Sequence, residues 1–188
     1  MSKRLNATHY ENIPSFPKGS KRKDRIVHAV METVQGSSHK NALDNDLGII
    51  ALHQVLADGR TWPYDYGFIP QTLADDGDPL DILFLVDKPT FPGCLVQARV
   101  LGSVKLKKNG IENDRVIGAP VKMRGTVQSA DAYDDIRDLP EAKIDAIQTF
   151  LVGYSEAEGN AIDVLGIVSA GDAMTSVRKY LRRFKQNR

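Results

Sequence analysis

The sequence has only one cysteine, Cys94, among its 188 residues. A single cysteine excludes a disulfide bond within the chain, so a hydrophobic core has to hold the fold together. A chain of this length can bury such a core without cross-links. The scarcity of cysteine is also compatible with a reducing compartment, and we expect a cytoplasmic protein.

Long apolar runs are missing as well. No stretch approaches the roughly 20 apolar residues that a membrane-spanning helix needs. Residues 1–17 contain no apolar run of the kind that forms a secretory signal. We therefore expect no membrane partner.

The chain also lacks an excess of charge of one sign. It carries 25 basic and 24 acidic residues, which gives a net charge of +1. Proteins that bind nucleic-acid phosphates usually show a clear positive excess, so we expect no nucleic-acid partner. The basic residues gather in two runs, at 18–25 and 178–188, which we interpret as a solvated arm and a solvated helix face. Contact with an acidic partner or with another subunit is the alternative.

Short apolar runs separated by Gly, Asn, Asp or Pro predict a series of strands. The expected strands are Ile26–Glu32, Gly48–Leu56, Ile82–Val86, Cys94–Leu106 and Arg115–Ala119. Their separators are too short for crossover helices, so the sheet should be mainly antiparallel and should close into a small barrel. Residues 1–24 are polar, and we interpret them as an arm that precedes a domain over residues 25–188.

Two helices are expected after the strands. Pro140 suits the first turn of one helix, and the other begins at about Asp172. Their apolar stripes are Ile144, Ile147, Phe150, Leu151 and Tyr154 in the first and Ala173, Val177, Tyr180, Leu181 and Phe184 in the second. Strands followed by helices predict an α+β fold, a small closed five-stranded OB-like antiparallel β-barrel with two C-terminal helices packed on it.

The segment 75–81 packs four carboxylates, Asp75, Asp76, Asp78 and Asp81, into seven positions. Like charges this close repel one another and raise each other's pKa values, so the segment favours a bound cation. Mg²⁺ takes oxygen ligands and suits such a cluster. A solvated acidic turn is the alternative, whereas a calcium loop of the EF-hand type is excluded because Asp81 stands where that loop needs glycine.

The residues before this cluster give a more specific signal. The segment Trp62–Leu83 contains an aromatic-Pro-x-x-Tyr-Gly stretch followed by Asp-x-Asp-Pro-x-Asp. It closely resembles the signature of the family I soluble inorganic pyrophosphatases, and a looser resemblance runs from about Ile26 to Phe184. The resemblance implies an inorganic diphosphatase that hydrolyses inorganic diphosphate to two phosphates. It also implies a homo-oligomer.

The resemblance further implies roles for individual residues around a metal-activated water. Asp76 and Asp81 would bind Mg²⁺, or another divalent cation, and Asp78 would help to deprotonate the water. Tyr66 matches a tyrosine near the reacting groups, and Glu32 would support a metal from its second shell. Shared metals lower the pKa of such a water and clamp the attacking and leaving oxygens.

A second set of positions is implied to bind the substrate's phosphate groups. Lys40 ends an element, Glu-x-x-x-Gly-Ser-x-x-Lys, that begins at Glu32. Arg115 stands where the family has a phosphate-binding lysine, and Tyr154 matches a phosphate-contacting tyrosine.

Several positions depart from the family pattern. Ala42 replaces a carboxylate, Gln54 an arginine and Ser155 a lysine, while Lys108 and Asn113 stand where two metal-binding aspartates are expected. A shift of one residue would bring Asp114 in as a metal ligand. Lys108 would instead place an ammonium where a cation is expected. Two alternatives therefore stay open, a hydrolase of another phosphate compound and a non-catalytic relative that binds metal or phosphate.

Overall fold

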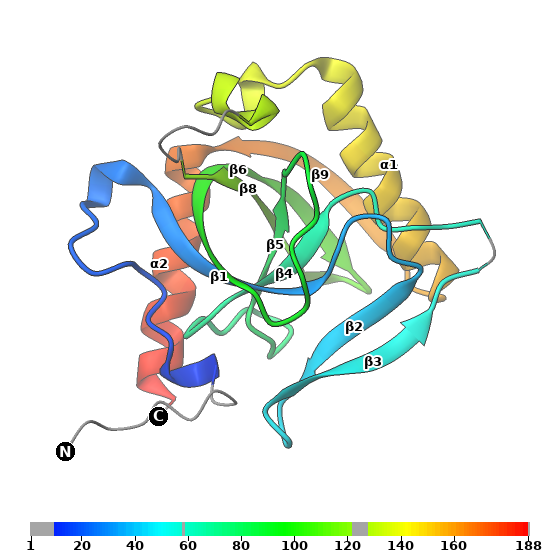
Figure 1. Ribbon diagram of the computed structural model, residues 1–188, viewed down its shortest axis with the longest axis horizontal. Coiled ribbons are helices and arrows are strands. Elements are labelled where there is room, and N and C mark those ends of the chain that lie inside the picture. The colour runs from blue at the N-terminus through cyan, green and yellow to red at the C-terminus, as the bar shows by residue number, and fades with distance from the viewer. Residues whose placement is uncertain (1–9, 58, 122–127, 188) are drawn as a thin grey trace.

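A computed structural model describes residues 10–57, 59–121 and 128–187. Five strands close into a barrel in which each strand pairs with the next and the last returns to the first (Figure 1). In barrel order they are β1 (Ile26–Thr33), β4 (Asp65–Ile69), β5 (Leu80–Phe84), β8 (Arg115–Pro120) and β6 (Leu95–Lys108). The predicted α+β barrel is confirmed. Four of its five pairs are antiparallel, and the pair β5–β8 is parallel.

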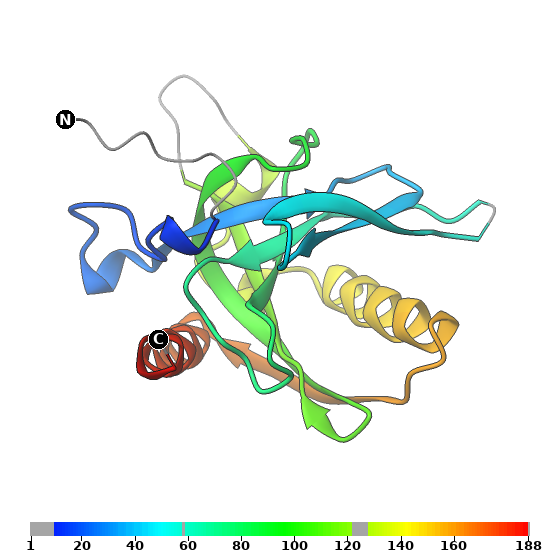
Figure 2. The same cartoon turned by 90° about the horizontal axis from the view of Figure 1, so that it is seen from below.

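Further strands extend the barrel. The 14-residue β6 continues beyond it and pairs with β9 (Ile162–Ser169) and with the short β7 (Ile111–Glu112). A separate hairpin of β2 (His39–Asp44) and β3 (Ile49–Val55) projects from the barrel (Figure 2). Our prediction omitted β2, β4, β7 and β9, and its order of strands first and helices afterwards is wrong for β9, which lies between the two helices.

Both predicted helices are present, and they cover different parts of the barrel (Figure 2). Helix α1 (Glu141–Ala157) begins directly after Pro140 and buries Ile147 and Leu151 in one core cluster. Helix α2 (Ala170–Gln186) is capped by Ser169 and buries Ala173, Met174, Val177 and Tyr180 in the other. Short 3-10 helices are η1 (Tyr10–Asn12), η2 (Arg22–Asp24), η3 (Ser129–Ala132) and η4 (Ile136–Asp138). Within the described residues, neither long helix combines the length and apolar character that crossing a membrane requires.

The described part of the N-terminal segment lies against the barrel. The hydroxyl of the buried Ser15 donates to Pro70 O at 2.6 Å, and the Ser15 carbonyl accepts from His28 N at 2.8 Å. The ring of Tyr10 meets that of Phe68 edge to face. Residues 10–24 are therefore in contact with the domain that follows them, and the boundary at residue 24 stays a prediction.

Gly67 lets β4 pass close to β1. A Cβ atom at this position would overlap Val30 O and lie 2.8 Å from Met31 Cα, which are backbone atoms that cannot rotate away. We expect Gly67→Ala to lower the free energy of unfolding by about 3 kcal/mol, as measured by urea denaturation. In the control Gly153→Ala, on α1, nothing lies within 4 Å of the new methyl group. This control should gain up to about 1 kcal/mol from helix propensity. Equal stability of the two variants would contradict the packing argument.

Candidate active site

One cleft of about 500 Å³ gathers almost all of the predicted site residues at one end of the barrel. Its walls come from the barrel strands, the loop before β5, the β2–β3 hairpin, the β6–β7 turn and the C-terminal end of α1. The predicted residues that line it are Glu32, Lys40, Tyr66, Asp76, Asp78, Asp81, Arg115 and Tyr154. Asp114 is the one predicted residue that does not line the cleft.

One wall of the cleft, which we call the acidic wall, is formed by Asp76, Asp78 and Asp81 from the β4–β5 loop and the start of β5. Thr72 holds this loop, since its hydroxyl donates to Ile69 O at 2.6 Å and accepts from Leu80 N at 2.8 Å. Asp76 and Asp78 lie in the loop, and Asp81 lies in β5 itself. The side chain of Asp76 also accepts from Asp78 N at 3.1 Å, which fixes the backbone between them.

The fourth carboxylate of the cluster, Asp75, serves the fold instead. It pairs with Arg183 at 2.6 Å and Lys179 at 3.3 Å, and it accepts from the Tyr180 hydroxyl at 2.8 Å. These three partners lie on α2, more than 100 positions away in the sequence. Asp75 therefore fastens the acidic loop to α2, while the other three carboxylates face the cleft.

The acidic wall resists full ionisation. Burial raises the pKa of Asp78, and the neighbouring Asp76 carboxylate raises it further. Burial also raises the pKa of Asp81, although Arg115 and Tyr66 act against this. Glu32 is the extreme case, because burial and then the charge of Asp81 raise its pKa to about 8. A cation that entered this wall would relieve the same repulsion that now favours bound protons.

Arg115 supplies a fixed positive charge beside these carboxylates. Its guanidinium lies 2.8 Å from Asp81 Oδ2 and also donates to Asn113 O at 2.9 Å. Only 12% of the Arg115 side chain is exposed, and its guanidinium lies over the ring of Tyr66. Burial holds the pKa of Tyr66 well above its usual value, so its hydroxyl stays protonated and donates to Asp81. The Arg115 guanidinium is thus held in a fixed position against Asp81, Asn113 and Tyr66.

The structure settles which residues of the loop before β8 face the cleft. Asn113 lines the cleft, and its amide Nδ2 donates to Asp76 Oδ2. Asp114 is buried and forms an ion pair with Lys105. Successive residues of an extended chain point to opposite sides, so the neighbours of Asp114 face the cleft and Asp114 itself does not. The prediction that Asp114 contributes a metal ligand is therefore corrected.

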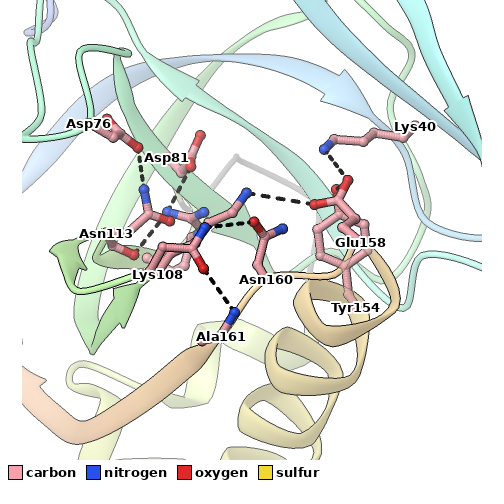
Figure 3. A network of polar contacts seen from close by, with 11 residues as sticks. Lys40, Asp76, Asp81, Lys108, Asn113, Tyr154, Glu158, Asn160 and Ala161 are labelled. Carbon is pink, nitrogen blue, oxygen red and sulfur yellow. Dashed lines mark hydrogen bonds and ion pairs between the residues drawn. The ribbon is translucent and has the colours of Figure 1, made fainter.

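The opposite wall is built around Glu158, which sequence reasoning missed. Its carboxylate lies 2.7 Å from Lys40 Nζ and 3.7 Å from Lys108 Nζ, and it accepts from the Tyr154 hydroxyl at 2.6 Å (Figure 3). Burial alone would raise the pKa of Glu158, but the bonds from Lys40 and Tyr154 hold it below its usual value. The available signal was the spacing, because residues four apart on a helix share a face and Glu158 follows Tyr154 at that distance.

Four of the positions that depart from the family pattern also line the cleft, namely Ala42, Lys108, Asn113 and Ser155. Gln54, the fifth, lines an adjoining groove between β3 and α1. The position expected to carry a phosphate-contacting arginine thus belongs to a neighbouring hollow in this chain.

The donor set of the acidic wall fits a hydrated Mg²⁺. Within the described residues, no three His, Cys, Asp or Glu side chains form a ready set of metal ligands. The wall nevertheless offers oxygen atoms, from Asp76, Asp78 and Asp81, and the buried Asn113 Oδ1 finds no hydrogen-bond partner among the described residues. Mg²⁺ usually takes one or two carboxylates and keeps several waters, so a sparse set of oxygen donors suits it.

Comparison with known proteins gives a consistent result. The sequence model of the family described as Inorganic pyrophosphatase matches residues 29–185. The inorganic pyrophosphatase of Thermus thermophilus is 38% identical over 177 residues, which cover 93% of this chain and 98% of that protein. That of Synechocystis is 34% identical over 174 residues, covering 92% and 97%.

Solved structures agree with the sequence comparison. The crystal structure of the Thermus thermophilus inorganic pyrophosphatase superposes with a TM-score of 0.79 at 37% identity, covering 93% of this chain and 99% of that one. The inorganic pyrophosphatase from Neisseria gonorrhoeae gives a TM-score of 0.82 at 27% identity, covering 94% and 99%.

Proposed function

The chain belongs to the inorganic pyrophosphatase family, a family of diphosphate hydrolases, and from this premise we propose that it hydrolyses inorganic diphosphate to two phosphates with Mg²⁺ as cofactor. We include other divalent cations that take oxygen ligands in this proposal. The observation that carries the proposal is the division of the cleft into an acidic wall with Asp76, Asp78 and Asp81 and a wall that gathers Lys40, Lys108 and Tyr154. A substrate made of two linked phosphates needs both, one to admit cations and one to hold the anion.

Asp76 and Asp81 would hold the Mg²⁺, which when bound lowers the pKa of a water and offsets the charge of the phosphate oxygens. Asp78 lies in the loop that Thr72 fixes, close to the carboxylates of Asp76 and Asp81. Its raised pKa brings it nearer to the range in which a carboxylate can accept a proton. We propose that the Asp78 carboxylate accepts the proton of the attacking water.

The remaining residues bind and orient the substrate. Lys40, Arg115 and Tyr154 donate to its phosphate oxygens, and the Tyr66 hydroxyl keeps Asp81 in place. Water oxygen adds to one phosphorus, the bridging P–O bond breaks, and its electron pair leaves with the second phosphate. Fixed donors such as Arg115 stabilise the charge that develops without reorganising.

Glu32 has a supporting role in this proposal. Its side chain accepts from Leu43 N at 2.7 Å, which joins β1 to the β2–β3 hairpin. We propose that it supports the metal from its second shell. We also propose a cytoplasmic homo-oligomer with an N-terminal arm over 1–24 and a catalytic domain over 25–188, without membrane or nucleic-acid partners.

A second candidate substrate is a less charged phosphate compound. It is favoured by one observation, that Glu158 already neutralises part of the charge of Lys40 and Lys108. The test is phosphate release at a fixed Mg²⁺ concentration from inorganic diphosphate, a nucleoside triphosphate and p-nitrophenyl phosphate. We expect diphosphate to be turned over at about 1 per second or faster and far ahead of the other two. Preference for the ester or the nucleotide would replace the first candidate with the second.

A further inference from the structure

We propose that Glu158 is an internal competitor of the substrate and thereby sets the affinity of the cleft for phosphate groups. Its carboxylate makes the contacts to Lys40, Lys108 and Tyr154 that a phosphate group of diphosphate would make. Substrate binding then exchanges one anion for the other. The inference rests on the proposed function, because it concerns the phosphate-binding wall of the same cleft.

Three donors from three separate elements converge on this one carboxylate. Lys40 lies on β2, Lys108 ends β6, and Tyr154 lies on α1 (Figure 3). Only 11% of the Glu158 side chain is exposed. Ammonium and hydroxyl groups donate to carboxylate and phosphate oxygens alike, so the same arrangement can bind either anion.

The neighbour of Lys108, Asn109, fixes the turn from which Lys108 projects. The Asn109 side chain donates to Asn160 Oδ1 at 2.9 Å and accepts from Ala161 N at 2.9 Å. These bonds join the β6–β7 turn to the connection that follows α1. The turn thus keeps the start of the Lys108 side chain close to Glu158, and the Lys108 ammonium lies 3.7 Å from the Glu158 carboxylate.

The helix itself does not favour an anion at this place. Glu158 caps the C-terminus of α1, and its backbone N–H is bonded to the last carbonyls of the helix. The negative end of the helix dipole disfavours a carboxylate there. The Glu158 charge is therefore stabilised by Lys40, Lys108 and Tyr154, the groups that a phosphate would engage.

The charges that line the cleft indicate whether loss of the Glu158 charge raises or lowers the affinity for an anion. The cleft is lined by five carboxyl groups and by three cationic side chains, which are Glu32, Asp76, Asp78, Asp81 and Glu158 on the one hand and Lys40, Lys108 and Arg115 on the other. Neutralising Glu158 would remove one of the negative charges and leave Lys40 and Lys108 without this internal carboxylate partner. The affinity for a multiply charged anion should rise, because the cations are no longer shared with an internal carboxylate.

The alternative is that Glu158 only fastens the hairpin and the β6–β7 turn to α1. The variant Glu158→Gln separates the two explanations, because the amide oxygen still accepts from Lys40 and Tyr154 while the charge is lost. Internal competition predicts tighter phosphate binding in this variant. A fastening role predicts unchanged or weaker binding.

The experiment is isothermal titration of inorganic phosphate and of methylenediphosphonate, a non-hydrolysable diphosphate analogue, at a fixed Mg²⁺ concentration. We expect Glu158→Gln to bind the analogue roughly tenfold more tightly than wild type, equivalent to about 1.4 kcal/mol. The matched control is Glu156→Gln, which removes the same charge from an exposed position on the same helix outside the cleft. Its affinity should stay within about twofold of wild type.

Unchanged or weaker binding in Glu158→Gln would overturn the inference, and so would equal tightening in both variants. If Glu158→Gln does not fold, Glu158→Asp takes its place. Its carboxylate is one methylene further back, and tighter binding is again expected. Diphosphate hydrolysis by the wild type, measured on the same preparation, keeps the proposals apart. Hydrolysis without tightening refutes only the competition, and tightening without hydrolysis refutes only the proposed function.

Discussion

Asp78→Asn is expected to lower kcat for diphosphate by about 10²–10⁴-fold, the usual contribution of a positioned general base. Asparagine has the same shape but cannot take up the proton of the attacking water. The contact that orders this part of the loop runs from Asp78 N to the Asp76 carboxylate, so it survives the substitution. KM should therefore change far less than kcat. Steady-state phosphate release over a range of diphosphate concentrations separates the two quantities.

The control for this prediction is Asp163→Asn, which removes the same charge from an exposed position of β9. It should leave kcat within about twofold of wild type. A kcat for Asp78→Asn within threefold of wild type would remove Asp78 from the proposed chemistry.

Arg115→Met is expected to cost both stability and activity. The guanidinium offsets the Asp81 carboxylate at 2.8 Å, and its loss leaves that largely buried charge uncompensated. Breaking such a pair from one side costs about 3 kcal/mol, and the free energy of unfolding measured with urea in the absence of metal should fall accordingly. The proposed phosphate contact is lost as well, so kcat/KM for diphosphate should drop by about 10²-fold or more.

Arg115→Lys is the matched variant, because it keeps the charge and loses the guanidinium, whose Nη1 contacts both Asp81 and Asn113 O. It should recover most of the stability and only part of the activity. An Arg115→Met protein as stable as wild type would contradict the role assigned to this ion pair.

The strands and helices of the barrel could be predicted from the sequence where local signals were strong. Gly, Asn, Asp and Pro separators marked four of the five barrel strands, together with β3 of the hairpin, and Pro140 marked the start of α1. The parallel pairing of β5 with β8 could not be predicted, because alternation of side chains carries no strand direction. β9 was missed as well, and its pairing with the distal part of β6, about 60 positions earlier in the chain, is set by the tertiary fold.

The acidic wall was predictable because charge crowding is visible in the sequence, and the resemblance added Lys40, Arg115 and Tyr154. Asp114 was assigned wrongly because a one-residue uncertainty in an extended segment exchanges the two faces. The role of Asp75 could not be predicted, since its partners lie on α2. Glu158 had a local signal, its spacing from Tyr154, but its contacts to Lys40 and Lys108 depend on the tertiary fold.

The most direct test of the account is phosphate release from inorganic diphosphate by the purified wild type, with Mg²⁺, with EDTA, and with Mg²⁺ restored after EDTA. Asp78→Asn, purified in the same way, reports any diphosphatase carried over from the expression host. The proposed function predicts turnover that requires Mg²⁺, returns with it, and far exceeds that of Asp78→Asn. Release that persists in EDTA, or that Asp78→Asn matches, would contradict it.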